Sequence, residues 1–306
     1  MDWKKIKTEE RNERTAHIDE LPTIDMVRLM NDEDKKVALA VEQETEHIAA
    51  AVDVIAAQLK EGGRLIYCGC GTSGRLGVLD AVECPPTYST DPDMVVGLIA
   101  GGYGAMFRAV EGAEDDAALG EKDLRELNFS RKDVLVGIAA SGRTPYVLGA
   151  MAYAGSVGAH VIAVTCCPGS PAAEAAEISI APVPGPEVIT GSTRMKSGTA
   201  QKMVLNMLST GAMIQLGKVY GNLMVDVKPT NEKLVARCRR IVCTAAGVDE
   251  ETAKQALAQC GCHPKTAIVM LRLGIGAGEA RTLLEQSEGR IAAALERGKN
   301  NGASAL

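Results

Sequence analysis

The chain has 306 residues, enough for two domains of ordinary size or for one larger α/β unit with an appendage. Hydrophobic residues make up 46% of it and charged residues 24%, and its 32 glycines and 12 prolines follow no fixed period, which excludes disordered and fibrous proteins. The formal net charge of -6 argues against a nucleic-acid partner. Because only 3% of residues are aromatic, we expect an aliphatic core.

The N-terminal segment predicts a polar arm followed by a long helix. Residues 1–30 are polar, and Asn31 is placed to cap a helix with Asp34 at the capping-box position. Apolar residues at helical spacing then continue to Gly62, where we expect the helix to end. They are Val37, Val41, Ile48, Val52, Ile55 and Leu59.

Short apolar runs after this helix predict a parallel sheet. Helix-like segments separate the runs, which is the arrangement that gives right-handed βαβ crossovers. The expected strands are 64–68, 94–100, 134–139, 160–166 and 178–181. A closing helix is expected over residues 198–217.

From residue 231 onward the pattern changes to short helices. Asp249 is placed to cap one, Pro264 opens another, and Gly278 precedes a third that ends near Gly298. We therefore expect an α/β fold in three parts. These are an N-terminal arm and helix over 1–50, an α/β domain over 51–228, and a small helical domain over 229–306.

The cysteines and histidines predict neither disulfides nor a metal site. The nine cysteines include no C-x-x-C pair and mostly lie in apolar segments, as expected for reduced core thiols of a cytoplasmic protein. Four scattered histidines supply few metal ligands, so we expect no metal and no other cofactor. Residues 1–12 lack the apolar region of a signal peptide, and glycines and prolines interrupt the uncharged stretch 144–173, so no export and no membrane span are expected.

Three loops rich in glycine, serine and threonine predict a bound phosphate. Residues 69–74 follow the first strand as G-x-G-x-x-G, a pattern in which backbone amides and a helix N-terminus attract an anion. The second loop, 140–145, follows the third strand, and the third, 191–199, precedes the closing helix. All three belong at the carboxyl edge of one sheet, where small ligands bind. Their polar residues are Thr72, Ser73, Ser141, Arg143, Thr144, Ser192, Thr193 and Lys196.

The composition of these loops is also compatible with two different roles. Serine and threonine at helix starts are often only N-caps, which is the commoner outcome for any single loop. A dinucleotide site also uses G-x-G-x-x-G, but it needs an acid at the end of the second strand, where this chain has Ala100, Gly101 and Gly102. A nicotinamide-dependent dehydrogenase is therefore the weakest hypothesis.

Longer segments carry a specific resemblance. GTSGRLGVLDAVECPPT, AVEGAEDD, GIAASGRTPYV, and PEVITGSTRMKSGTAQKMVLNMLST followed by GKVYGNLMVDV are similar to the N-acetylmuramic acid 6-phosphate etherase family, whose members have the sugar isomerase (SIS) fold. The similarity runs from Thr8 to about residue 242, with a looser fit in the helical tail. One departure is Cys70, where we expect alanine. The resemblance implies an SIS-type parallel sheet sandwiched by helices.

The resemblance also implies an activity. It is cleavage of the lactyl ether of N-acetylmuramic acid 6-phosphate to N-acetylglucosamine 6-phosphate and D-lactate, in peptidoglycan recycling. By motif, the catalytic residues are Glu83 and Glu114, and the phosphate ligands are Ser73, Ser141 and Thr144 with Ser192. From their residue type, Arg143 and Lys196 are expected either to offset phosphate charge or to lie exposed at the surface. Family members pair, which implies a homodimer with the site near the subunit interface, and the wide apolar stripe of the helix over 34–59 agrees with this.

Two carboxyl groups suit this reaction because an ether is cleaved more readily by elimination than by direct hydrolysis. A base removes the C2 proton of the ring-opened sugar, and an acid protonates the lactyl oxygen as it leaves C3. Glu83 is expected at a helix end closed by Pro85, where the helix dipole favours the protonated acid. A solvated acid at a helix end fits this position equally well, and the resemblance decides for the catalytic role. Glu114 is assigned as the base with Glu111 as the fallback, although their acidic run alone predicts only a solvated face.

Two alternatives use the same fold. A non-catalytic sugar-phosphate sensor is disfavoured because no basic helix-turn-helix segment precedes the domain. An aldose-ketose isomerase would need the base but no acid aimed at an ether oxygen. Release of D-lactate separates the etherase from both.

Overall fold

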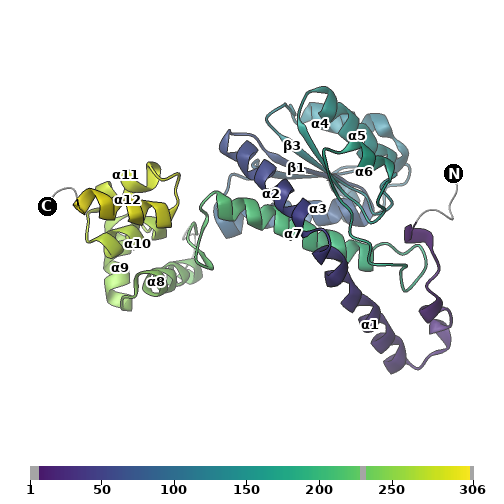
Figure 1. Cartoon of the computed structure of the whole chain (residues 1–306), viewed down its shortest axis with the longest axis horizontal. Helices are drawn as coiled ribbons and strands as arrows, with labels where there is room; N and C mark the ends of the chain where they lie inside the picture. Colours follow the sequence, from purple (N-terminus) through teal and green to yellow (C-terminus); the bar gives the residue numbers. More distant parts are fainter. Residues whose placement is uncertain (1–6, 228–231, 304–306) are drawn as a thin grey trace. The chain divides into compact units, whose positions relative to one another are not determined.

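The structure, a computed structural model, describes residues 7–227 and 232–303, which form two compact units (Figure 1). The first unit comprises Met1–Val82 and Pro92–Gly211, and the second comprises Glu83–Asp91 and Ala212–Leu306. The helices α3 (Gly71–Tyr88) and α7 (Lys196–Gln215) each contribute residues to both units. The boundary expected between residues 228 and 229 lies outside the described residues.

A five-stranded parallel sheet forms the centre of the first unit, which confirms the predicted α/β class. Its strands are β1 (Leu65–Gly69), β2 (Val95–Ile99), β3 (Val134–Ile138), β4 (His160–Val164) and β5 (Ile178–Ile180). Their order in the sheet is β2-β1-β3-β4-β5. Because all the strands are parallel, the loops after β1 and β3 open at the same edge.

Helices cover both faces of this sheet (Figure 1). One face packs against α4 (Ala117–Glu126), α5 (Pro145–Ser156) and α6 (Pro171–Ala175), with Ile66 and Leu135 in the aliphatic core between them. On the other face, the Tyr67 hydroxyl of β1 donates to Asp80 Oδ2 of α3 at 2.9 Å and to the Leu205 carbonyl of α7 at 3.4 Å. The closing helix expected over 198–217 is confirmed as α7.

The N-terminal arm differs from the single long helix that the sequence predicts. Short 3-10 turns precede two helices, α1 (Thr23–Glu42) and α2 (Thr45–Lys60). The prediction of a helix start at Asn31 is wrong, because the Pro22 carbonyl already accepts the amides of Asp25 and Met26, at 2.9 and 3.0 Å. Asn31 therefore lies inside α1, and the expected continuous helix is broken between α1 and α2.

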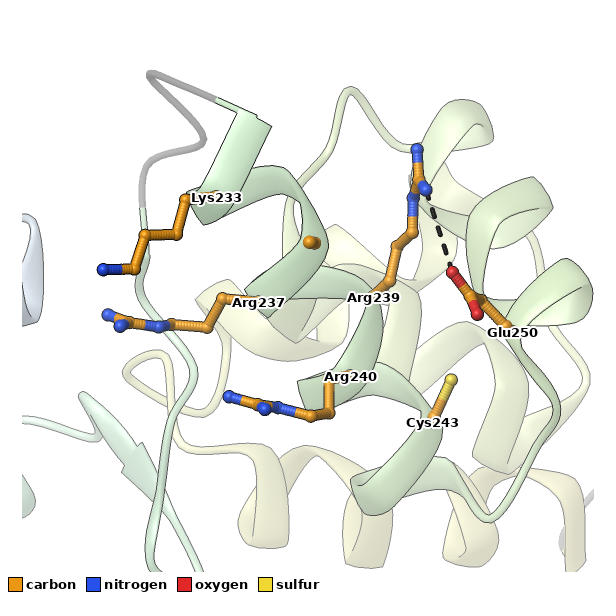
Figure 2. A pocket seen from close by; sticks show the side chains of 7 residues that line it. Lys233, Arg237, Arg239, Arg240, Cys243 and Glu250 are labelled. Carbon is orange, nitrogen blue, oxygen red and sulfur yellow. Dashed lines mark ion pairs between the residues drawn. The ribbon is translucent and has the colours of Figure 1, made fainter.

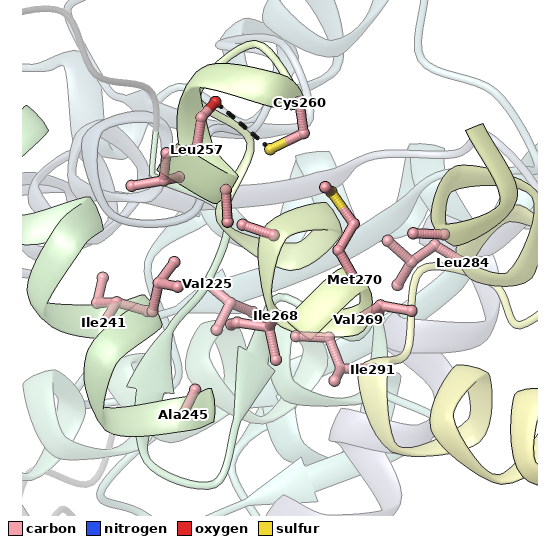
Figure 3. Packing of buried hydrophobic residues seen from close by; sticks show 14 of the residues in the cluster. Val225, Ile241, Ala245, Leu257, Cys260, Ile268, Val269, Met270, Leu284 and Ile291 are labelled. Atoms are coloured by element: carbon pink, nitrogen blue, oxygen red, sulfur yellow. Dashed lines mark hydrogen bonds between the residues drawn. The ribbon is translucent and has the colours of Figure 1, made fainter. Parts of the chain in front are cut away.

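The second unit is a helical bundle preceded by a small hairpin of β6 (Val219–Tyr220) and β7 (Leu223–Met224). Its helices are α8 (Glu232–Ala246), α9 (Glu250–Gln259), α10 (Pro264–Leu273), α11 (Ala277–Glu285) and α12 (Ile291–Ala303). Figure 3 shows Ile268 and Val269 of α10 among apolar side chains of the neighbouring elements. The helix starts predicted at Asp249 and Pro264 are confirmed.

The last predicted helix is in fact two. A turn containing Gly289, with φ of 72°, separates α11 from α12. Gly298 lies inside α12 and does not end it. Glycine is needed here for packing, because a β-carbon at this position would collide with the Leu273 side chain. This glycine permits close packing of α12 on α10.

All nine cysteines are free thiols, six of them buried. Within residues 7–227 and 232–303, no helix is long and apolar enough to cross a membrane. No group of three or more His, Cys, Asp or Glu side chains is arranged to hold a metal ion in the described part of the chain.

Candidate active site

The first predicted loop, which follows β1, is held against α7. Ser73 is buried, and its hydroxyl donates to Gln201 Oε1 at 2.9 Å. The Thr72 methyl lies so close to Gly198 that a β-carbon on that glycine would be 3.3 Å away. The first and third loops therefore meet. Gln201 Nε2 is buried there with no hydrogen-bond partner among the described residues.

The second loop, after β3, contains polar groups that the fold does not use. Thr144 occupies the N-cap position of α5, yet its side chain makes no capping hydrogen bond, so capping alone does not account for it. Ser141 Oγ accepts the Arg143 amide at 3.3 Å. Arg143 Nε is buried with no hydrogen-bond partner in the part of the chain described. These groups gather at the N-terminus of α5, where the helix dipole favours an anion.

The third loop leads into a helix start that already holds a carboxylate. Glu187 is fully buried and accepts the backbone amides of Lys196 and Ser197, each at 2.9 Å, and the Ser197 hydroxyl at 2.8 Å. The first turn of α7 therefore has amides that are not open to a ligand. Ser192 and Thr193 lie half-buried in the preceding turn and can contribute through their hydroxyl groups.

The sequence predicted that Lys196 holds the phosphate. The structure places its side chain in a buried ion pair instead. Its side chain has 0% exposure, and its ammonium lies 2.9 Å from Glu33 Oε2 and 3.0 Å from the Pro184 carbonyl. Burial opposes ionisation of Glu33, but hydrogen bonds from Lys36 and Lys196 outweigh it and lower the pKa of Glu33 to about 2. The other partners of Glu33 are Asn12 and Arg14, at 3.0 and 2.6 Å.

A cavity of about 200 Å³ lies at the carboxyl edge of β1 and β2. Glu111 and Glu114 both line it, so the assigned base and its fallback share one cavity with the first loop. Burial, helped by the charge of Glu114, raises the pKa of the Cys70 thiol to about 12. The other lining residues are Gly71, Arg75, Ala100, Ala105, Ala109, Val110, Gly112 and Ala113.

Glu83 is an exposed residue of α3. The helix end predicted at this position is wrong, because α3 continues through Pro85 and Pro86 to Tyr88. Its last turn closes where the Ser89 amide donates to the Pro85 carbonyl at 2.9 Å, with Ser89 in the left-handed region at φ of 53°. Because the helix ends beyond Glu83, the negative end of its dipole does not lie at this carboxyl group and does not favour the protonated acid there.

A larger cavity of about 490 Å³ lies in the second unit, beside α8. Figure 2 shows Lys233, Arg237 and Arg240 extending from α8 toward the same side, whereas Arg239 extends toward Glu250, 3.8 Å away. The first three form no ion pair with any described residue. Ala236 and Cys243 complete the lining. Sequence reasoning missed this basic row, although its residues recur at helical spacing.

Three residues around the loops of the first unit were also not predicted from the sequence. Arg75 stands just after the glycine-rich motif, whose glycines and hydroxyl groups give the stronger signal. Glu33 is buried, but it was not predicted because the helix start was misplaced at Asn31. That error puts Glu33 in the first turn of a helix, where an acid is expected to be solvated. Glu187 precedes the third loop, and only the tertiary contact with α7 distinguishes it from an ordinary loop acid.

Comparison with protein families agrees with this fold. Residues 47–155 match the glucokinase regulatory protein N-terminal SIS domain, and residues 119–211 match the SIS domain. Among solved structures, phosphoheptose isomerase from Neisseria gonorrhoeae is similar, with a TM-score of 0.50 and 20% identity. That similarity covers 62% of this chain and 98% of the isomerase, and it shows the fold alone.

Similarity to individual proteins extends over nearly the whole chain. N-acetylmuramic acid 6-phosphate etherase of Photorhabdus laumondii is 63% identical over 93% of this chain and 94% of its own length. The protein of the same name from Photobacterium profundum is 61% identical over 98% of this chain and 99% of its own length. The one from Clostridium beijerinckii is 56% identical, with 97% of both chains covered.

Proposed function

This chain belongs to the N-acetylmuramic acid 6-phosphate etherase family, and from that premise we propose how its residues carry out the reaction. It is a carbon-oxygen lyase that cleaves the D-lactyl ether of N-acetylmuramic acid 6-phosphate in the recycling of cell-wall amino sugars. The products are N-acetylglucosamine 6-phosphate and D-lactate. Identity of 56 to 63% over nearly the full length carries this conclusion and leaves no support for the sensor and isomerase alternatives.

The reaction is an elimination followed by an addition. In the ring-opened sugar, the C2 hydrogen is acidic because it lies next to the C1 aldehyde. A base takes this proton, the C3–O bond to lactate breaks, and an acid protonates the departing oxygen. Water then adds its oxygen to C3 of the unsaturated aldehyde and C2 regains a proton, so that the overall change is hydrolysis of the ether.

We assign the base role to Glu114. Its place beside Cys70 and Gly71 of the first loop supports the assignment, because a sugar held at that loop brings C2 within reach of the same cavity. Glu111 lines this cavity too and remains the fallback. We assign the acid role to Glu83 by its position in the family motif DAVECPP.

We place the substrate phosphate at the polar groups of the three loops. Ser141 and Thr144, with Arg143 beside them, meet the helix dipole at the start of α5, and Thr72 and Ser73 lie at the start of α3. Ser192 and Thr193 add hydroxyl groups. We assign Lys196 a structural role. Its ammonium is paired with Glu33, and its backbone amide donates to Glu187, which holds the start of α7 next to the third loop.

The test of the proposed function is direct. Purified protein is incubated with N-acetylmuramic acid 6-phosphate, and D-lactate is measured with a stereospecific dehydrogenase. Stoichiometric D-lactate together with N-acetylglucosamine 6-phosphate is the expected result. A ketose phosphate without lactate would support the isomerase, and no turnover at all would support the sensor.

We also propose that the protein is a cytoplasmic homodimer whose catalytic domain spans residues 51–228, between an arm over 1–50 and a helical domain over 229–306. Exposed apolar side chains on α1 support a partner: Ile24, Val27 and Leu39 are 56%, 53% and 63% exposed. Sedimentation at micromolar concentration is expected to give a dimer. A fully active monomer would contradict this assembly.

A further inference from the structure

Arg75 has an arrangement that its place in the fold does not require. This residue of α3 is half-buried and lines the same cavity as Glu111 and Glu114. Its Nε donates to the Met106 carbonyl at 3.1 Å, and its Nη2 donates to the Ala105 carbonyl at 2.7 Å. Two backbone acceptors therefore occupy one edge of the guanidinium and hold its plane in one orientation.

The opposite edge of the guanidinium keeps its donors. A guanidinium has five N–H donors, so Nη1 and the second hydrogen of Nη2 remain after the two carbonyls are counted. Arg75 forms no ion pair with any described residue, although two glutamates line the same cavity. Among the described residues lining this cavity, Arg75 is the sole cation. Two adjacent N–H groups facing one way match the two oxygens of a carboxylate.

The substrate carries such a carboxylate at the required place. One carbon separates the lactyl carboxylate from the ether oxygen on C3, and C3 is bonded to C2. A sugar whose C2 reaches Glu114 therefore brings this carboxylate into the neighbourhood of Glu111 and Glu114, whose charges repel it. A fixed cation in the same cavity offsets that repulsion.

We propose that Arg75 is the specificity-determining residue that binds the lactyl carboxylate of the substrate through the free edge of its guanidinium. The 6-phosphate is held elsewhere, by the hydroxyl groups of the three loops and by the amides of the first two. The inference rests on the proposed function, because it concerns the substrate of that reaction. It assigns to Arg75 the distinction between the lactyl ether and a neutral ether on the same sugar phosphate.

The experiment pairs one variant with one substrate analogue. The analogue is N-acetylmuramic acid 6-phosphate with its carboxylate converted to a carboxamide, which keeps the shape and the ether but removes the charge. For the unaltered protein, kcat/KM is expected to be roughly 10- to 100-fold higher for the acid than for the amide, as for loss of a hydrogen bond to a charged group. In Arg75→Gln this ratio is expected to fall to near one, through loss of turnover of the acid alone.

Two controls separate binding from structure. Arg108→Gln changes an exposed arginine near the same loop, outside the cavity lining, and is expected to leave the ratio unchanged. Arg75→Lys keeps the charge without the paired donors and is expected to give an intermediate ratio. If Arg75→Gln lowers both substrates equally, Arg75 only supports the carbonyls of residues 105 and 106, and the proposal is wrong.

Failure of the role proposed for Arg75 can be distinguished from failure of the proposed function. Release of D-lactate from the natural substrate by the unaltered protein tests the etherase activity itself. If that activity is present but the acid and the amide are turned over equally well by the unaltered protein, only the role of Arg75 fails. This comparison needs no variant, so it holds even where Arg75→Gln does not fold.

Discussion

The buried pair of Glu33 and Lys196 gives the sharpest prediction of stability. Replacing Glu33 by Gln removes the only carboxylate that the described residues place within ion-pair distance of the Lys196 ammonium, leaving Pro184 as its charge-stabilising acceptor. Because Lys196 has no exposed surface, water cannot compensate. Breaking a buried pair from one side typically costs about 3 to 5 kcal/mol, and we expect a loss in this range for Glu33→Gln.

Thermal unfolding measures this loss. For a unit of this size, each kcal/mol lowers the midpoint by about 2 to 4 °C, so Glu33→Gln is expected to unfold roughly 6 to 20 °C earlier than the unaltered protein. The matched control is Asp32→Asn on the same helix, whose partner Lys35 is 66% exposed and 2.8 Å away. Since water screens that pair, no measurable shift is expected.

Two further results test the reasoning. The double variant Glu33→Met with Lys196→Met removes both charges and is expected to recover much of the stability, since apolar side chains can replace a buried pair. Glu33 has a pKa lowered from 4.5 to about 2, so its contribution is complete above pH 4.5 and is lost as the pH falls toward 2. The difference in unfolding free energy between the unaltered protein and Glu33→Gln should therefore shrink as the pH falls from 4.5 toward 2. A loss below about 1 kcal/mol at pH 7 would refute the argument.

Four more outcomes follow from the proposed chemistry. Glu83→Ala should lose D-lactate release by at least about 100-fold but still exchange the C2 hydrogen with solvent, whereas Glu114→Ala should lose both; a proton NMR assay in D₂O decides this. Unphosphorylated N-acetylmuramic acid should have a far lower kcat/KM than its 6-phosphate, and comparable values would remove the phosphate site. Reaction in ¹⁸O-water should label C3 of the sugar and leave lactate unlabelled, so label in lactate would indicate direct displacement. Cys70, whose pKa is raised to about 12, should react with iodoacetamide very slowly at pH 7.5 and faster as the pH rises, and rapid alkylation at neutral pH would contradict the raised pKa of this half-buried thiol.

The order of strands and helices was predictable because it depends on local patterns. Each strand is a short apolar run, and the parallel arrangement follows from the helices between the runs. The helix starts at Asp249 and Pro264 were predictable for the same reason, since a cap and an N-terminal proline act within one turn.

The local signals for helix ends failed at three places. The proline pair in α3 predicts a helix end, yet the helix continues to Tyr88 and closes at Ser89. Gly298 carries the signal of a helix end but serves the packing of α12 against Leu273. Asparagine is favoured at helix N-caps, but Asn31 lies within α1 because that helix already starts at Pro22.

The sequence by itself determined the fold class, the family and the candidate glutamates, because long motifs and apolar periodicity are properties of the chain alone. Only the tertiary structure decided which polar groups are free to meet a substrate. Lys196 and Arg75 are both basic residues in motifs at the same sheet edge, but one is buried against Glu33 while the other keeps an edge of its guanidinium unpaired in the cavity of Glu114. The sequence shows that both residues are basic, but the partner of Lys196 lies 163 positions away and is known only from the tertiary structure.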